Sequence, residues 1–240
     1  MSFPKYQKIS ENNIDKIEVK FLKEHYRLLL DREKCTGCNV CVRICPKDAF
    51  RKYKPEGPKD LFGKKVIYKK KRYYVPFVED PDICVFCGLC TYLCPFEALK
   101  IESNGKEVKQ EKIKLVELEA VPKLIFKRVK LNSGEEAKVY TQGKIDINVE
   151  ECNTGCKNCA EICPTGAIRV GTEVFSKKDN EWEKDLKIEI YPNECIYCGA
   201  CYSICPTGAV KLHIEEINYS GKYNSPFWDD ILDKLKLNGA

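Results

Sequence analysis

The chain has 240 residues, of which 32% are charged and 43% hydrophobic, and its formal net charge is +5. Its apolar stretches are no longer than a β-strand, so no membrane-spanning helix is expected, and its first sixteen residues lack the apolar core of a secretion signal. Sixteen cysteines in such a chain are expected in a reducing compartment, the cytoplasm, where disulfides are rare.

The segment before the first cysteine, residues 17–30, contains an apolar stretch from Tyr26 to Leu30 that predicts the opening β-strand. His25 and His213 are the only histidines and lie far apart in the sequence, which favours ordinary strand or surface roles over acid–base catalysis. The chain also has no phosphate loop and no dinucleotide fingerprint. We therefore expect no catalytic residues, with any substrate chemistry on another chain.

All sixteen cysteines fall into four runs, and each run closes on Cys-Pro. Three runs have the spacing C-x2-C-x2-C-x3-C-P, and the third has one extra residue at 153–155. A 4Fe–4S cluster needs one thiolate at each of four iron corners, and this spacing is typical of its ligands. The sequence thus predicts four 4Fe–4S clusters. The cofactor-binding cysteines are Cys35, Cys38, Cys41 and Cys45; Cys84, Cys87, Cys90 and Cys94; Cys152, Cys156, Cys159 and Cys163; and Cys195, Cys198, Cys201 and Cys205.

Zinc and disulfides are the alternatives to iron–sulfur chemistry. Structural zinc usually takes two Cys-x2-Cys pairs that a longer gap separates, and disulfides need an oxidising compartment. Gly37, Gly88 and Gly199 favour the cluster, because a loop that wraps an inorganic group needs positive φ and close backbone approach.

Residues 64–79 alternate basic and aromatic positions and predict a β-hairpin. Its basic character fits a solvated strand edge or an acidic partner surface better than RNA. Each oxidised cluster with its four thiolates carries a charge of about −2, so four clusters would change the net charge from +5 to roughly −3. The net charge therefore does not favour nucleic-acid binding.

Residues 107–149 alternate apolar and charged positions, which predicts two or three long strands that turn at 132–134. We expect this β-rich arm to separate the two halves or to clasp a neighbour. Further strands are predicted at 145–149, 168–170, 188–191 and 210–214.

The C-terminus predicts a helix with Ser225 as its N-cap, Pro226 in its first turn and Gly239 after its last turn. Phe227, Trp228, Ile231, Leu232 and Leu235 recur at helical spacing. This stripe is expected to pack on its own domain, and docking to a partner is the alternative.

The gap between the second and third runs is the longest, which favours pairing the first run with the second and the third with the fourth. The predicted fold class is α+β, with two tandem two-cluster bacterial ferredoxin-like domains, β-hairpin insertions and a C-terminal helix. We place the first domain with its basic hairpin at 1–105, the arm at 106–144 and the second domain at 145–240. A nested pairing, the first run with the fourth around the second with the third, is the alternative.

The cysteine runs and the motifs that follow them, such as CPTGAI, resemble the polyferredoxins, which are tandem bacterial-type ferredoxin repeats known from methanogenic archaea. In two-cluster ferredoxins the fourth cysteine of one run binds the cluster of the other run. The resemblance therefore implies four ligand sets: Cys35, Cys38, Cys41 with Cys94; Cys84, Cys87, Cys90 with Cys45; Cys152, Cys156, Cys159 with Cys205; and Cys195, Cys198, Cys201 with Cys163.

The implied function is that of a low-potential electron wire inside a larger oxidoreductase complex, with redox partner proteins and the other subunits as partners. Among polyferredoxins the chain is similar to the subunit of formylmethanofuran dehydrogenase, an enzyme of methanogenesis. A free ferredoxin-type carrier and a subunit of a hydrogenase assembly are the alternatives. Tyr92, Tyr197 and Tyr202 are expected to pack near the clusters and not to relay electrons.

Overall fold

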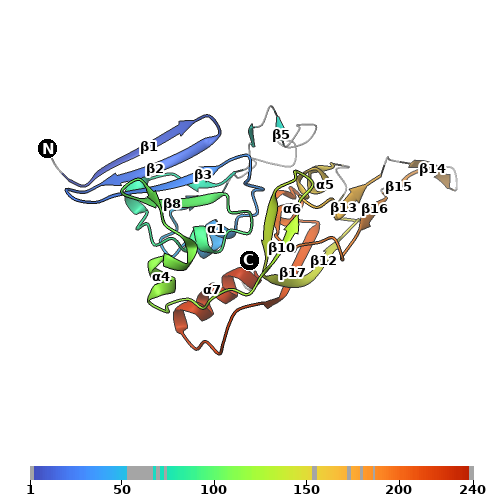
Figure 1. The fold of residues 1–240 in the computed structure, drawn as a ribbon. Helices are drawn as coiled ribbons and strands as arrows, with labels where there is room; N and C mark the ends of the chain where they lie inside the picture. Colours follow the sequence, from blue (N-terminus) through green and yellow to red (C-terminus); the bar gives the residue numbers. More distant parts are fainter. Residues whose placement is uncertain are drawn as a thin grey trace.

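The computed structural model describes residues 3–52, 67–68, 71–72, 75–152, 156–171, 174–178, 181–185 and 187–237. Its two halves lie side by side, and the C-terminal helix lies below the first half and ends at the junction between them (Figure 1). Short helices and antiparallel strands alternate, which confirms the α+β prediction. Within these ranges, no helix has the length and apolar character needed to cross a membrane. The insertion at 153–155 and Gly239 lie outside the described residues.

The N-terminal half is covered by a five-stranded antiparallel sheet in the order β1-β2-β3-β8-β9. Its strands are β1 (Lys5–Glu11), β2 (Ile14–Lys20), β3 (His25–Asp31), β8 (Leu99–Ser103) and β9 (Lys106–Glu107). The strand predicted at Tyr26–Leu30 is confirmed, but two strands precede it, so it does not open the fold. The strand β1 lies at the edge of the sheet, and almost every one of its residues is exposed. Its sequence therefore lacks the alternation of apolar and polar residues from which a strand is predicted.

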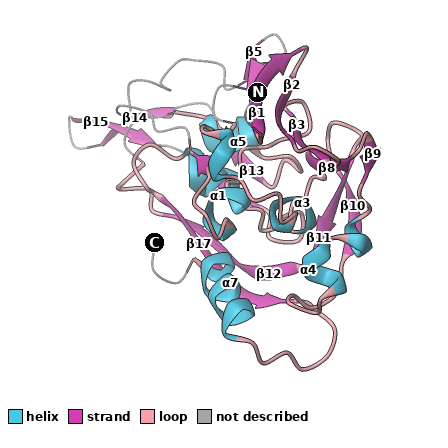
Figure 2. Cartoon of the chain, turned by 90° about the vertical axis from the view of Figure 1, so that its left-hand side faces the viewer, coloured by secondary structure: helices cyan, strands magenta, loops and turns pink. Residues whose placement is uncertain are grey.

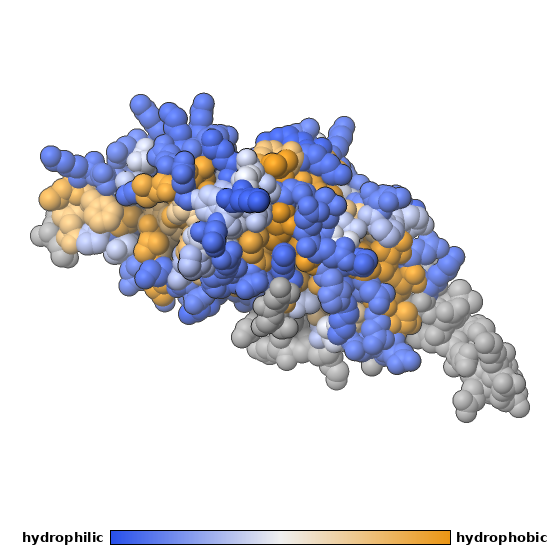
Figure 3. Space-filling model, turned by 90° about the horizontal axis from the view of Figure 1, so that it is seen from below, coloured by the Kyte–Doolittle hydropathy of each residue, from blue (hydrophilic) through white to orange (hydrophobic). Residues whose placement is uncertain are grey.

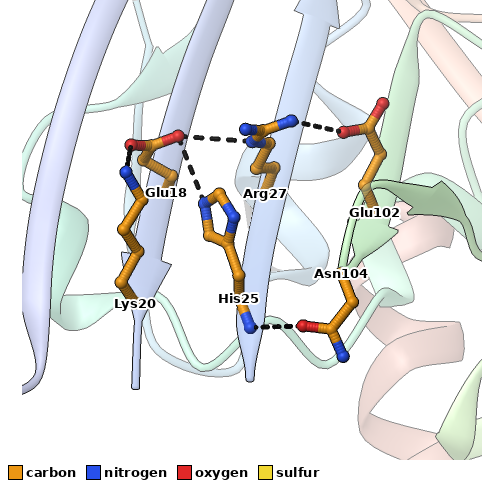
Figure 4. Close-up of polar contacts among 6 residues, drawn as sticks. All are labelled: Glu18, Lys20, His25, Arg27, Glu102 and Asn104. Atoms are coloured by element: carbon orange, nitrogen blue, oxygen red, sulfur yellow. Dashed lines mark hydrogen bonds and ion pairs between the residues drawn. The ribbon is translucent and has the colours of Figure 1, made fainter. Parts of the chain in front are cut away.

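A buried carboxylate ties three strands of this sheet together. Glu18 on β2 contacts Lys20 at 3.1 Å and both His25 and Arg27 on β3 at 3.3 Å, and Arg27 reaches Glu102 on β8 at 3.4 Å (Figure 4). Burial raises the pKa of Glu18, but the hydrogen bonds and positive charges of Lys20 and His25 outweigh burial and hold that pKa below its ordinary value. His25 is thus a strand residue with a structural contact, as the sequence predicted.

The sheet lies over the first two cysteine runs. The elements around these runs are α1 (Val40–Ile44), β4 (Phe50–Arg51), β7 (Phe77–Val78), the 3-10 turn η1 (Pro81–Ile83) and α3 (Leu89–Tyr92), and β4 pairs with β7. In the basic insertion, β5 (Ile67–Tyr68) pairs with β6 (Lys71–Arg72), which confirms a hairpin there. The first half thus consists of two cysteine runs enclosed by antiparallel strands.

The segment predicted as long strands begins instead with a 3-10 turn η2 (Gln110–Lys112) and helix α4 (Lys114–Glu117). Ile113 and Val116 are buried, whereas Leu118 is 66% exposed, so the apolar pattern follows one helical turn and not an alternating strand. The predicted turn at 132–134 is confirmed between β10 (Lys127–Lys130) and β11 (Glu136–Val139).

This β10-β11 hairpin packs on the chain itself. The Lys138 amide donates to the carbonyl of Pro95 at 2.7 Å, and the buried Tyr140 hydroxyl donates to the carbonyl of Leu93 at 2.5 Å. The arm therefore lies against the end of the second cysteine run and joins the halves.

The second half repeats the design with smaller sheets. Its strands form three antiparallel pairs: β12 (Thr141–Ile147) with β17 (Val210–Ile217), β13 (Ile168–Val170) with β16 (Ile188–Ile190), and β14 (Val174–Lys178) with β15 (Glu181–Asp185). Two short helices, α5 (Asn158–Ile162) and α6 (Ala200–Ile204), carry cysteines. The strands predicted in this half are confirmed with small shifts of their ends. His213 lies on β17 and pairs with Lys144 across that sheet.

The predicted C-terminal helix is α7 (Pro226–Lys236), which begins after Ser225. Trp228, Ile231 and Leu235 are buried on one face, and α7 packs against both α1 and β17 (Figure 2). The Trp228 ring meets Tyr219 edge to face at 5.4 Å between ring centroids. The prediction that the stripe packs on its own domain is therefore confirmed only in part, because α7 packs on β17 of the second domain and also on α1 of the first. The buried Trp228, Ile231 and Leu235 are not available for docking to a partner.

Candidate metal centres

Three of the four runs share a backbone design, a loop with two left-handed residues followed by a short helix. The residue before the second cysteine has positive φ (Gly37 70°, Phe86 50°, Tyr197 50°), and so has the residue after it (Asn39 58°, Gly88 80°, Gly199 81°). The positive φ predicted at the three glycines is confirmed. At Gly88 a Cβ atom would also lie 2.7 Å from the side chain of Ile113, so glycine serves packing as well as conformation there.

This loop design turns backbone amides toward sulfur. The amides of Gly37 and Tyr197 donate to the Sγ atoms of Cys35 and Cys195, each at 3.4 Å. Behind the first run, the Ala49 amide donates to Cys45 Sγ at 3.3 Å. Such N–H···S contacts stabilise thiolates and tune the potential of a bound cluster.

Two cavities each bring together three cysteines of one run and the last cysteine of its neighbour. One is lined by Cys84, Cys87 and Cys90 with Cys45, which we call the second-run set. The other is lined by Cys195, Cys198 and Cys201 with Cys163, the fourth-run set. Apolar side chains such as Leu28, Phe50 and Ile196 complete these walls, so the thiols face largely apolar surroundings.

The other two groups of cysteines lie close enough to interact electrostatically. Burial chiefly raises the pKa of Cys38, Cys41 and Cys159, and nearby cysteines add to this rise, among them Cys94 for Cys38 and Cys41 and Cys205 for Cys159. We call Cys35, Cys38, Cys41 and Cys94 the first-run set, and Cys152, Cys156, Cys159 and Cys205 the third-run set. In the second-run and fourth-run sets the last cysteine thus comes from the neighbouring run, and the helices that carry the runs pack in the same pairs, α1 against α3 and α5 against α6. Crossed ligation in the first-run and third-run sets stays a prediction.

Burial dominates the protonation of these thiols. It raises the pKa of Cys38 and Cys84 to about 11 and that of Cys159 to about 12, and it holds the pKa of Cys90 and Cys198 well above the ordinary value. Without a cation these thiols are therefore neutral at pH 7, and metal binding must displace their protons.

This donor set fits a polynuclear iron centre. Four soft thiolates at an apolar, amide-lined cavity match the ligands of a cubane, and all sixteen cysteines, each within the described residues, are free of disulfides. Among the described histidine, cysteine and acidic side chains, no three converge closely enough to hold a single metal ion.

The third run departs from the shared design. Lys157, which precedes α5, has φ −108° and not the left-handed conformation of Asn39, Gly88 and Gly199. Cys152 and Cys156 are half-buried, while Cys159 is buried. The extra residue of this run thus coincides with a different entry into the helix.

The two halves meet at Cys38. Its backbone carbonyl accepts a hydrogen bond from Arg43 Nη1 on α1 and another from Ser203 Oγ on α6, each at 3.2 Å. The charge of Cys38 also contributes to the raised pKa of Cys198. The first-run and fourth-run sets are therefore neighbours, and the four sets follow one another in the order second, first, fourth, third.

Sequence reasoning missed Arg43 and Ser203, although an alignment of the runs contains a signal. Both occupy the second position after the third cysteine of their run, where the other runs have Tyr92 and Glu161. Tyr92 itself donates to the Pro122 carbonyl at 3.0 Å and accepts from the Leu124 amide at 2.9 Å, which fits the packing role predicted for it.

Comparison with known families and structures gives consistent matches. The model of a 4Fe-4S dicluster domain matches residues 34–98 and 151–209, which together exceed half of the chain. A second 4Fe-4S dicluster model matches residues 76–164. That second window joins the second and third runs, whereas in the structure the first run packs on the second and the third on the fourth.

An uncharacterized polyferredoxin-like protein of Methanocaldococcus jannaschii is 31% identical over 83 residues, which are 33% of this chain and 49% of that protein. The match thus spans about half the length of this relative. Among solved structures, the fold is similar to a chain of the formate dehydrogenase, heterodisulfide reductase and formylmethanofuran dehydrogenase complex from Methanospirillum hungatei. That match has a TM-score of 0.73 at 21% identity and covers 98% of this chain and 92% of the other.

Proposed function

Because this chain belongs to the 4Fe-4S dicluster domain family, we propose that it conducts electrons through four 4Fe–4S clusters and performs no substrate chemistry of its own. The bound clusters would supply one-electron redox chemistry at low potential, on the order of −400 mV. The observation that carries this proposal is the contact at Cys38, which brings the first-run and fourth-run sets together and makes one continuous series of the four sets.

In this proposal the four crossed cysteine sets are the ligands, and the chain divides into the units 1–105, 106–144 and 145–240. The protein's task is to hold each set, to exclude water with apolar walls, and to direct amide hydrogens at sulfur. The rigid, repeated loops keep these donors in place whichever charge a bound cluster carries.

Anaerobic reconstitution with iron and sulfide tests the proposal. We expect about sixteen iron atoms and as many acid-labile sulfides per chain, with the absorption and EPR signals of reduced 4Fe–4S clusters. Colourless protein that contains zinc and no labile sulfide would refute it. The thiols require a reducing compartment, which supports a cytoplasmic location.

The expected partners are the other subunits of an oxidoreductase complex, and formylmethanofuran dehydrogenase is the specific candidate. The likeness in fold to a chain of the Methanospirillum hungatei complex and the partial likeness to a polyferredoxin-like protein support this choice. Purification of the chain from its native source should recover such subunits with it. A free ferredoxin-type carrier would run as a monomer in native size analysis, and a hydrogenase subunit would be recovered with hydrogenase chains.

A groove beside the second-run set offers a surface on which such a partner could dock. This open groove is lined by Cys84, Cys87, Phe21 and Leu118, and Leu22 nearby is 84% exposed. Hydrophobic surface gathers at this end of the molecule, at the left of Figure 3. A redox subunit that fills this groove would approach the second-run set directly. The variant Leu118→Glu should then weaken recovery of that subunit and leave the iron content unchanged.

A further inference from the structure

Two cationic side chains adjoin the first-run set. Lys138 on β11 is 2% exposed and is the one buried lysine or arginine among the described residues. Its Nζ donates to the Tyr92 carbonyl at 3.0 Å and to Gln110 Oε1 at 2.9 Å, and it lies 5.8 Å from the centroid of the Phe126 ring. These acceptors and the ring face hold an ammonium inside the protein.

Arg43 is the second cation. Its Nη1 donates to the Cys38 carbonyl, and its Nε is shielded from solvent without a hydrogen-bond partner within the described structure. A guanidinium keeps its charge in proteins, so this positive charge is permanent. Arg43 and Lys138 line the same small cavity between the halves, together with Tyr140 and Cys198.

Both charges act on the same set of thiolates. Arg43 lies on the helix that carries Cys41 and donates to the Cys38 carbonyl, and the backbone amide of Lys138 donates to the carbonyl of Pro95, the residue after Cys94. The other sets differ, as far as the described residues extend: Lys47 borders the second-run cavity but is exposed, so water screens it, and no lysine or arginine lines the fourth-run cavity. In the third run Lys157, next to Cys156, is exposed as well. The direct hydrogen bonds of Arg43 and Lys138 go to the backbone of the first two runs, at Cys38 and Tyr92, whereas the fourth-run set contributes only Cys198 to their cavity.

We propose that Arg43 and Lys138 give the first-run cluster the highest reduction potential of the four. This inference rests on the proposed function, because it assumes that the cysteine sets hold clusters. A reduced cluster carries one more negative charge than an oxidised one, and a cation in a low-dielectric setting stabilises the reduced form more. An electron that enters from either end of the series would therefore rest at the junction of the halves.

Anaerobic redox titration followed by EPR tests this inference on the full reconstituted chain. In Arg43→Gln and in Lys138→Met, one of the four one-electron steps should move to lower potential. The equilibrium constant of that step should fall about tenfold, which is 59 mV for a one-electron couple. The step that moves should be the one missing from Cys38→Ala protein.

Matched variants separate charge from structure. Arg43→Lys keeps the charge and should restore the potential, and Lys100→Met, which removes an exposed lysine paired with Glu107 at 2.8 Å, should shift no step. Lys138→Met keeps a side chain of similar length, so it remains a test if Arg43→Gln fails to fold. Full iron content with all four steps unchanged in the folded variants would overturn the inference. Iron well below sixteen atoms in the unaltered chain would instead overturn the proposed function.

Discussion

Ser203 on α6 donates a hydrogen bond from its hydroxyl to the backbone carbonyl of Cys38, at 3.2 Å and across 165 residues of sequence. The contact joins the helix that carries Cys201 to the loop that carries Cys38, so the two halves meet at their cysteine sets. A neutral hydrogen bond of this kind contributes about 1 kcal/mol to stability.

Ser203→Ala should lower the free energy of unfolding by about 1 kcal/mol, because the Cys38 carbonyl then accepts a hydrogen bond from Arg43 alone. Anaerobic denaturant titration of the reconstituted protein measures the change. The exposed Ser220→Ala is the control and should lie within about 0.5 kcal/mol of the unaltered chain. Equal stability of the two variants would contradict the assigned role of Ser203.

Crossed ligation predicts a non-additive loss of iron. Cys38→Ala and Cys94→Ala belong to one set, so the double variant should lose about four iron atoms, no more than either single variant. Cys38→Ala with Cys45→Ala affects two sets and should lose about eight. Iron and labile-sulfide analysis after reconstitution gives these counts. If the pair Cys38 and Cys45 behaved as one set, each run would bind its own cluster.

Trp228 on α7 is fully buried and packs against Tyr219, and Trp228→Ala should cost about 3–5 kcal/mol, since it empties this buried site. Phe227→Ala, one position earlier on a half-buried face, should cost markedly less. Hydrogen exchange of α7 and thermal unfolding measure the two effects. A Trp228→Ala protein with normal protection of α7 would show that the helix is held by other contacts.

Glu18 predicts a pH-dependent contribution to stability. Its pKa in the folded chain is lowered, so its stabilising effect is present above the ordinary value of 4.5 and is lost as the pH falls through the folded-state pKa. Glu18→Gln should therefore cost about 1 kcal/mol at pH 7, where Lys20, His25 and Arg27 lose a charged partner. The cost should shrink below pH 4.5.

Thermal unfolding of both proteins at each pH measures the difference, and loss of clusters in acid affects both alike. Glu107→Gln, which breaks the exposed pair with Lys100, is the matched control and should change stability little at either pH. A cost for Glu18→Gln that stayed constant from pH 7 to acid would show that packing, and not charge, accounts for it.

The nature of the metal sites could be predicted from local sequence, because the ligands of one cluster come mostly from one run and their spacing follows the curl of a single loop. The same local logic predicted the left-handed Gly88 and Gly199, the strands beside each run and the start of α7 after Ser225. It failed for residues 110–118, where short apolar spacing fits a helical turn as well as a strand, and for β1, whose exposed edge has no apolar face.

The sequence alone therefore determined the chemistry, four thiolate runs for four clusters, and it favoured consecutive over nested pairing of the runs without deciding between them. Only the tertiary structure decided which runs are neighbours, the second with the first, the first with the fourth and the fourth with the third, and that Arg43 and Lys138 meet at the junction of the halves. Ligand spacing is a local property of the chain. Ser203, which contacts Cys38 from the other half, is 165 positions away in the chain, and no repeat or period in the sequence encodes that the two meet.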